Sequence, residues 1–144
     1  MDAQRPRLLV VDDDRAILSL IGGVALSEGF EVATTDDSAD ALMQVLKRPA
    51  DLVLLDLRMP GGTGFDVLRS IREVNSRCKV VLMTAFGTID NAVEAVKLGA
   101  SDYLTKPFDL ARLRQLLRDV RSEAEQRRAV LTLERDVAQR LEFC

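Results

Sequence analysis

The chain has 144 residues, of which 47% are hydrophobic and 30% charged, and its formal net charge is −3. That length suffices for one domain with its own core plus a short appendage. The chain contains no histidine, which excludes histidine acid–base catalysis, histidine metal ligands and a phosphohistidine intermediate within it. The slight negative charge offers no case for direct nucleic-acid binding by this segment.

No apolar run approaches the roughly 18 residues that a membrane-spanning helix requires, and the N-terminus lacks the pattern of a signal peptide. Cys78 and Cys144 do not form a CxxC or other metal-binding spacing, and two isolated thiols are typical of a reducing compartment. We therefore expect a cytoplasmic protein that makes no contact with a membrane.

Five short apolar segments are predicted to be β-strands. The first, third and fourth are almost uninterrupted runs of Val, Leu and Met without polar alternation. Strands of this kind are buried on both faces, which indicates a parallel sheet covered by helices on either side. In chain order the predicted strands are Arg7–Asp12, Glu31–Thr34, Asp51–Asp56, Lys79–Thr84 and Ser101–Leu104.

Segments with helical periodicity alternate with these strands. They are Asp14–Glu28, Ser38–Lys47, Gly64–Glu73, Thr88–Leu98 and a last helix from Asp109 onward. The expected N-cap residues are Asp37 or Ser38 for the second helix, Thr88 for the fourth and Asp109 for the fifth. Gly29 and Gly99 stand where a helix C-terminus favours a positive φ. Five βα units in about 120 residues predict a doubly wound α/β sandwich.

The last helix is predicted to be unusually long, because from Asp109 to about Arg140 the chain has no Gly or Pro. An apolar stripe at three- and four-residue spacing runs along it: Leu113, Leu117, Val120, Ala124, Leu131, Ala138 and Leu141. Arg127 and Glu134 interrupt this stripe, so two interpretations are open: a coiled coil, or a last helix that ends near Ser122 and continues as a frayed tail. We divide the chain into a domain at 6–122 and an extension of the last helix at 123–144.

Polar side chains gather where the predicted parallel strands end. The first strand runs into Asp12 and Asp13, the third ends in Asp56 and the fourth in Thr84, and Lys106 follows the fifth. In a doubly wound sheet these carboxyl ends share one edge, and ligands bind there. Two carboxylates about 5 Å apart repel by roughly 3 kcal/mol at an effective dielectric of 20, so such a cluster requires positive charge.

This set of residue types suits phosphoryl chemistry with a divalent cation. Mg²⁺ prefers carboxylate oxygens and keeps several waters, so we expect Asp13 and Asp56 to bind it directly and Asp12 through a bound water. Asp56 is then placed as a carboxylate nucleophile toward a phosphoryl group. Lys106 and the Thr84 hydroxyl are expected to bind the oxygens of the transferred group.

Four motifs together resemble the receiver domain of two-component response regulators: VVDDD, VLLDLRMPGGTGFDVL, VVLMTA and GASDYLTKPF. They occur in the order and spacing of that family, over about residues 6–122. The longer stretch AFGTIDNAVEAVKLGASDYLTKPFD further resembles the NtrC-like activators of alternative-sigma-factor transcription. The resemblance implies a flavodoxin-like fold with a five-stranded parallel sheet in the order 2-1-3-4-5.

The resemblance also implies a role for each residue of the acidic cluster. Asp56 matches the aspartate that becomes 4-aspartylphosphate, and Asp12 and Asp13 match the acidic pair around Mg²⁺. The backbone carbonyl of Arg58 matches the third protein ligand of the metal. Asp14 stands at a position that the family often fills with Glu, and we interpret it as a helix-start residue and not as a ligand.

Other positions match the family's conformational switch. Thr84 corresponds to the switch hydroxyl, Tyr103 to the switch aromatic and Lys106 to the family's lysine, and the Lys106–Pro107 bond is expected to be cis. Arg58 and Phe86 are expected to border the position of an attacking water, where the bulk of Phe86 would prolong the life of the phosphoaspartate.

The implied function is phosphoryl transfer from the phosphohistidine of a sensor histidine kinase to Asp56. The chain would catalyse its own phosphorylation and dephosphorylation without acting as a turnover enzyme. The readout would be a change in the face made by the fourth helix (Thr88–Leu98), the fifth strand (Ser101–Leu104) and the fifth helix. A homodimer is expected through that face or through the extended last helix.

Several alternatives stay open. A receiver that takes up no phosphate would be a docking module only. A haloacid-dehalogenase-type phosphatase shares the spacing of Asp12 and Asp14, but here no Gly-Thr follows Asp14 and no later strand carries its second acidic pair. The PGGTG stretch lacks the Gly-Lys-Ser/Thr of a phosphate-binding loop and is interpreted as a flexible loop. The chain is interpreted either as part of an NtrC-like activator or as a stand-alone regulator that acts by protein contact.

Overall fold

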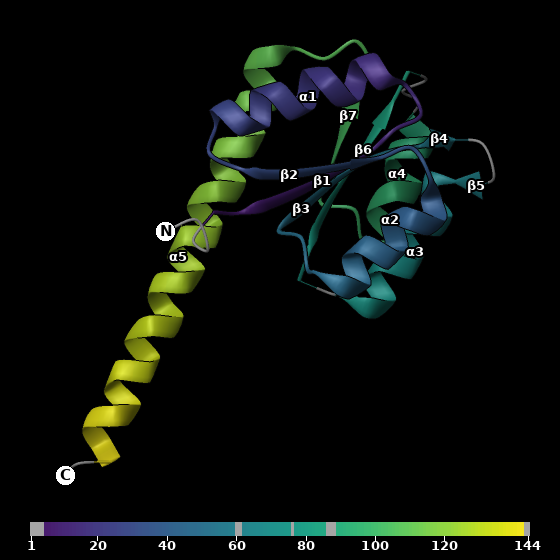
Figure 1. Ribbon diagram of the computed structural model, residues 1–144. Helices are drawn as coiled ribbons and strands as arrows, with labels where there is room; N and C mark the ends of the chain where they lie inside the picture. Colours follow the sequence, from purple (N-terminus) through teal and green to yellow (C-terminus); the bar gives the residue numbers. More distant parts are fainter. Residues whose placement is uncertain (1–4, 60–61, 76, 86–88, 143–144) are drawn as a thin grey trace.

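A computed structural model describes residues 5–59, 62–75, 77–85 and 89–142 (Figure 1). Its main sheet has five strands, all parallel, in the order β2-β1-β3-β6-β7. The strands are β1 (Arg7–Val11), β2 (Glu31–Thr35), β3 (Leu52–Asp56), β6 (Lys79–Thr84) and β7 (Asp102–Thr105). Counted along the chain this order is 2-1-3-4-5, which confirms the flavodoxin-like doubly wound fold.

Helices cover both faces of this sheet and bury two apolar layers. The helices are α1 (Arg15–Ser27), α2 (Ser38–Lys47), α3 (Gly64–Val74), α4 (Ile89–Lys97) and α5 (Leu110–Glu142). Successive side chains of a strand point to opposite faces, so Leu8 and Val10 pack toward α1 and α5, whereas Leu9 and Val11 pack toward α2, α3 and α4. The uninterrupted apolar runs of β1, β3 and β6 are therefore buried on both sides, as their sequences predicted.

The helix starts follow the predicted capping residues where these are described. The carboxylate of Asp14 accepts a hydrogen bond from the amide two residues on (2.9 Å), and Asp37, rather than Ser38, does the same for α2 (2.9 Å). Asp109 accepts from the amide two residues on (3.0 Å) at the start of α5. Thr88 lies outside the described residues. Each carboxylate pairs a backbone N–H that the helix itself leaves without a partner.

The two predicted left-handed positions at helix ends are confirmed. Gly29 follows α1 with a φ of +87°, and Gly99 follows α4 with a φ of +98°. A side chain at Gly99 would also press against Arg72 of α3, which donates a hydrogen bond from its Nε to the Gly99 carbonyl (2.8 Å). The turn after α4 is therefore tied to α3.

A small second sheet was not predicted. Two-residue strands β4 (Arg58–Met59) and β5 (Gly62–Thr63) pair antiparallel on either side of residues 60 and 61. The sequence analysis assigned this region to a flexible loop, and residues 60 and 61 lie outside the described part. Strands of two residues are too short to show the period-2 alternation by which strands are predicted.

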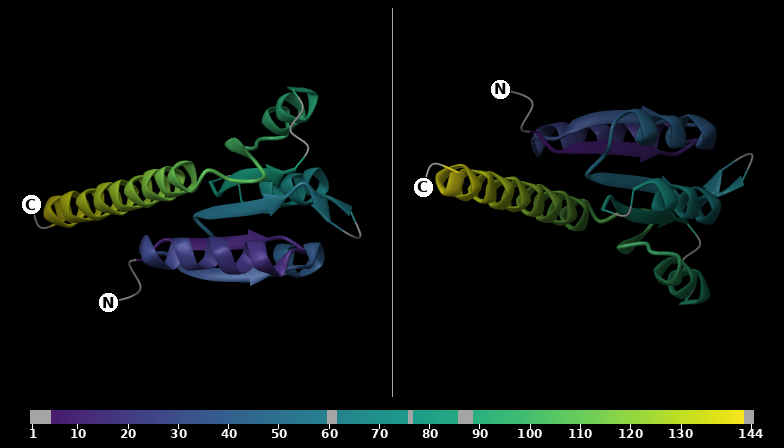
Figure 2. Two further views of the ribbon diagram at one scale, coloured as in Figure 1. Left: turned by 90° about the horizontal axis from the view of Figure 1, so that it is seen from above. Right: turned by 90° about the horizontal axis from the view of Figure 1, so that it is seen from below.

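The last helix is continuous from Leu110 to Glu142, so the interpretation in which it ends near Ser122 is wrong. Its first turns pack on the sheet, and Ala124, only 3% exposed, is the last buried residue in the described part of the helix. Beyond it the helix runs away from the body of the domain (Figures 1 and 2). No described helix is both long and apolar enough to span a membrane. The boundary at 122 and the coiled coil stay predictions.

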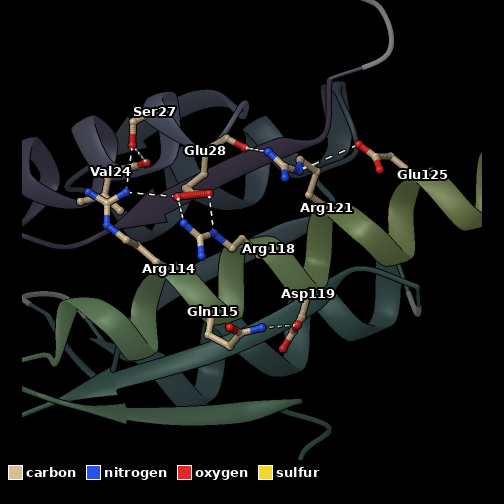
Figure 3. Close-up of polar contacts among 9 residues, drawn as sticks. All are labelled: Val24, Ser27, Glu28, Arg114, Gln115, Arg118, Asp119, Arg121 and Glu125. Atoms are coloured by element: carbon tan, nitrogen blue, oxygen red, sulfur yellow. Dashed lines mark hydrogen bonds and ion pairs between the residues drawn. The ribbon is translucent and has the colours of Figure 1, made fainter.

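A carboxylate clamp holds α5 against the end of α1 (Figure 3). The buried Glu28 carboxylate accepts hydrogen bonds from Arg114 Nη1 (3.1 Å) and from Arg118 Nε and Nη2 (3.1 and 3.2 Å). Arg121 Nη1 donates to the Glu28 carbonyl oxygen (2.6 Å). The hydrogen bond from Arg118, opposed by burial and assisted by Arg114, lowers the pKa of the Glu28 carboxyl. Because α1 has no basic residue in its last turn, these arginines supply the positive charge that its C-terminal carbonyls favour.

Candidate functional site

Three carboxylates converge at the carboxyl end of the sheet. The register of β1 and β3 pairs Val11 with Leu55, so the next residues, Asp12 and Asp56, come side by side. Asp12 is fully buried, Asp56 is 6% exposed, and Asp13 is exposed. One carboxylate oxygen from each of these three aspartates lies within 4.8 Å of the other two. The sequence predicted this convergence from the strand ends.

Lys106 reaches the same cluster from the loop after β7. Its ammonium lies 2.6 Å from Asp12 Oδ2 and 3.5 Å from Asp56 Oδ2. Burial opposes the charged form, but the hydrogen bond and charge of Asp12, together with Asp56, raise the pKa of the Lys106 ammonium. Its backbone N–H donates to the Thr84 carbonyl (2.7 Å), and the bond into Pro107 is cis, as predicted.

The donor set fits a hard divalent cation. Among the described side chains three carboxylates face one ammonium in this cluster, so there the negative charge exceeds the positive charge even with Lys106 in place. Carboxylate oxygens are the ligands that Mg²⁺ favours, and an exposed Asp13 leaves one side open for the waters that this ion keeps. Asp14 turns its carboxylate to the helix start instead, which confirms its interpretation as a capping residue.

The predicted switch residues stand on the neighbouring strands. Thr84 ends β6, is 1% exposed, and its carbonyl accepts from Lys106. Tyr103 lies in β7 and is partly buried against the α2–α4 layer of the core. Within the described part of the chain its buried hydroxyl has no hydrogen-bond partner, which costs about 1–3 kcal/mol for a group of this kind.

Gly64 is a site residue that the sequence analysis missed. It begins α3 and donates its N–H to the Leu57 carbonyl (2.8 Å). A Cβ at this position would stand 2.6 Å from the Asp56 carbonyl oxygen and 2.8 Å from Leu57 Cα. Only glycine allows the backbone to approach the aspartate-bearing strand end so closely. The available signal was the last glycine of PGGTG, which was predicted to end a loop and begin the helix Gly64–Glu73, with no reason given for glycine there.

The structure does not test the predicted roles of Arg58 and Phe86. Arg58 lies in β4, where its backbone pairs with Thr63, and its part as a metal ligand stays a prediction. Phe86 lies outside the described residues, so its proximity to the site is not described either.

The comparisons with known proteins bear on this site. A family model described as the response regulator receiver domain matches residues 8–118. The chain belongs to this family. The transcriptional regulatory protein ZraR of Salmonella typhimurium is 41% identical over 110 residues, which cover 76% of this chain and 25% of ZraR. The DNA-binding response regulator MtrA of Mycobacterium tuberculosis is 38% identical over 141 residues, which cover 95% of this chain and 61% of MtrA.

Solved structures agree with the receiver fold. The receiver domain of NtrX from Brucella abortus superposes with a TM-score of 0.74 at 33% identity, covering 80% of this chain and 98% of that one. The chemotaxis protein CheY4 of Vibrio cholerae gives a TM-score of 0.75 at 27% identity, covering 81% and 98%. The chain spans only a quarter of ZraR and about three-fifths of MtrA, and their identities to it are similar. These similarities therefore establish the receiver domain without selecting one type of output.

Proposed function

We propose that this receiver domain accepts a phosphoryl group on Asp56 from the phosphohistidine of a sensor histidine kinase. The observation that carries the proposal is the convergence of Asp12, Asp13 and Asp56 with the Lys106 ammonium. An Asp56 carboxylate oxygen forms a bond to phosphorus while the phosphorus–nitrogen bond of the donor imidazole breaks. The freed imidazole nitrogen then takes up a proton, and the product on Asp56 is an acyl phosphate.

The cluster is suited to hold Mg²⁺ through Asp12, Asp13 and Asp56, with the Arg58 carbonyl as a further ligand. When bound, the ion supplies positive charge that neutralises the carboxylates and the oxygens of the incoming group. Lys106, held in place by Asp12 at 2.6 Å, is proposed to turn to the phosphoryl oxygens as they arrive next to Asp56. Because nucleophile, metal ligands and lysine all belong to this chain, a small donor such as acetyl phosphate is expected to serve as well.

The readout proposed for phosphorylation is a conformational switch. The new group carries nearly two negative charges and three acceptor oxygens, to which the Thr84 hydroxyl would donate. The space that Thr84 leaves would admit the ring of Tyr103, whose hydroxyl lacks a partner among the described residues. Driving a two-state equilibrium from 1:99 to 99:1 takes about 5.5 kcal/mol, which a few charge-assisted bonds of about 1.5–3 kcal/mol each can supply.

The surface that changes would be the one formed by α4, β7 and α5. We propose homodimerisation through this surface or through the extended α5, and transcriptional output of the NtrC-like type. A stand-alone regulator that acts by protein contact is the alternative proposal, because ZraR and MtrA match this chain at similar identity and so do not select one type of output.

Labelling with acetyl phosphate and Mg²⁺, followed by intact-mass measurement, tests the proposed reaction. The parent chain should gain the mass of one phosphoryl group and then stop, and Asp56→Asn should gain none. Rapid release of phosphate over many turnovers, beyond the slow release that the chain's own dephosphorylation gives, would instead indicate a phosphatase, and absence of labelling would indicate a docking module. Either of these results would overturn the proposal.

A further inference from the structure

The part of α5 beyond the body of the domain carries an apolar stripe on its surface. Val130, Leu133 and Val137 are 53%, 64% and 45% exposed, and they follow one another at positions i, i+3 and i+7. Residues at this spacing share one side of a helix, and it is the spacing of anchors that enter an apolar groove. The stripe lies on the segment that leads away from the body (Figure 1), and within the described part of the chain its three side chains are at least 45% exposed.

The same chain carries an apolar groove on its body. The groove lies between α1 and the edge strand β2, and its volume is about 450 Å³. None of the described lining residues is charged, and Leu26, one of them, is 60% exposed. The lining residues are Leu18, Ser19, Gly22, Gly23, Leu26, Val32 and Thr34. α1 itself has a single charged residue, Arg15, which is unusual for a helix at the surface.

Two glycines at the centre of α1 are not explained by packing within the chain. A Cβ at Gly23 would meet nothing within 4 Å, and one at Gly22 would make an ordinary contact of 3.8 Å with Val32 Cγ1. Neither has the positive φ that favours glycine. Each glycine costs a helix interior about 1 kcal/mol relative to alanine. Because glycine has no side chain, the surface of α1 next to β2 is low at these two positions, and a second helix can approach it closely.

We propose that the α5 stripe of one copy occupies the α1–β2 groove of a second copy, and that the exchange is reciprocal. The described residues of the groove and of the stripe are uncharged, and in the described part of the chain both surfaces are open to solvent. Reciprocal exchange gives two identical contacts and closes into a two-fold dimer. Pairing of stripe with stripe is disfavoured, since three apolar positions span two helical turns, whereas an independent coiled coil needs three to four heptads.

Two substitutions test the two halves of this contact separately. Leu133→Glu places a charge in the stripe, and Gly23→Leu fills the groove at a position where an added Cβ meets nothing within 4 Å. Leu131→Glu is the matched control for the first, because Leu131 is similarly exposed (52%) but does not belong to the set Val130, Leu133 and Val137; it lies on the other apolar stripe noted in the sequence. Ala16→Leu is the control for the second, since Ala16 is exposed on α1 outside the groove.

Sedimentation equilibrium should show a dimer for the parent chain and for both controls. Leu133→Glu and Gly23→Leu should each raise the dimer dissociation constant by at least about 30-fold, the effect of losing a hot-spot residue. An equimolar mixture of these two variants should associate again, because the Leu133 stripe of the Gly23→Leu chain still fits the groove of the Leu133→Glu chain. Thermal melting checks that both variants are folded.

Three results would overturn the inference. They are a monomeric parent chain, a Gly23→Leu variant that stays dimeric while Leu133→Glu does not, and a mixture that fails to associate. The second result would point to pairing of α5 with α5. Labelling by acetyl phosphate, measured on the same samples, should be equal in all variants, so failure of this inference is distinguishable from failure of the proposed phosphoryl transfer.

Discussion

Replacement of Gly64 by alanine should impair the site although no functional group is removed. The added Cβ would stand 2.6 Å from the carbonyl oxygen of Asp56 and 2.8 Å from Leu57 Cα, whereas ordinary contacts begin near 3.4 Å. Both atoms are backbone, so neither can turn aside as a side chain would. The strand end and the start of α3 must separate by about 0.8 Å to reach 3.4 Å from the carbonyl oxygen.

The magnitude follows from that displacement. Crowding of this kind in a packed region costs about 1–3 kcal/mol of unfolding free energy. A misplacement approaching 1 Å of a reacting group costs on the order of 100-fold in rate, and Asp56 is the residue that moves. We therefore expect Gly64→Ala to fold, with a lower melting temperature, and to be phosphorylated about 10- to 100-fold more slowly.

The assay is the initial rate of labelling by acetyl phosphate in saturating Mg²⁺, followed by intact mass, with chemical denaturation run beside it. Gly23→Ala is the matched control, because its Cβ meets nothing within 4 Å and the substitution favours the helix by up to about 1 kcal/mol. It should label at the parent rate. If Gly64→Ala also labelled within twofold of the parent rate and kept its stability, the close approach would not position Asp56.

Further outcomes concern individual charges and a thiol. Lys106→Met leaves the fully buried Asp12 without the ammonium that pairs with it, so in EDTA the unfolding free energy should fall by about 3 kcal/mol. Addition of Mg²⁺ should raise the unfolding free energy of this variant more than it raises that of the parent. A denaturation curve equal to that of the parent would contradict the ion pair. The pKa of Glu28 is lowered on folding, so its stabilisation is complete above the usual carboxyl pKa of about 4.3 and is lost as the pH falls through the folded pKa. Glu28→Gln should therefore lower stability at pH 7 and flatten the acid limb of a melting-temperature profile, and equal acid limbs would refute this. Burial raises the pKa of the Cys78 thiol to about 11, so in a Cys144→Ser background Ellman's reagent at pH 8 should react at least about 100-fold more slowly with the folded than with the unfolded chain.

The regular part of the fold was predictable because its signals are local. The predicted strand Lys79–Thr84 matches β6, and Asp51–Asp56 differs from β3 by one residue, since both are continuous apolar runs closed by polar residues. Asp14 and Asp37 also predicted the starts of their helices, because capping is a contact between residues close in the sequence. The two-residue strands β4 and β5 carried no such pattern and were missed.

The residues of the candidate site and of the Glu28 contacts also fall into two groups, those that the sequence could predict and those that only the fold brings together. The nearness of Asp12 and Asp56 follows from the rule that parallel strands end at one edge of the sheet, so residue type and strand end were enough. The clamp at Glu28 joins residues that are separated by 86 to 93 positions in the sequence and lie on two different helices. The Arg and Glu residues that form it have the pattern of an ordinary exposed helix surface, so the sequence does not predict it. Gly64 escaped notice for a related reason: its importance comes from a backbone brought to it by the fold.

The position of the phosphoryl group along the chain tests the proposed chemistry most directly. Borohydride reduces an acyl phosphate of aspartate to homoserine, so a chain labelled in Mg²⁺, reduced and digested should yield homoserine at Asp56 alone, and Asp56→Asn should yield none. Homoserine at Asp12 or Asp13, or a labelled Asp56→Asn chain, would contradict the assignment of Asp56 as the acceptor.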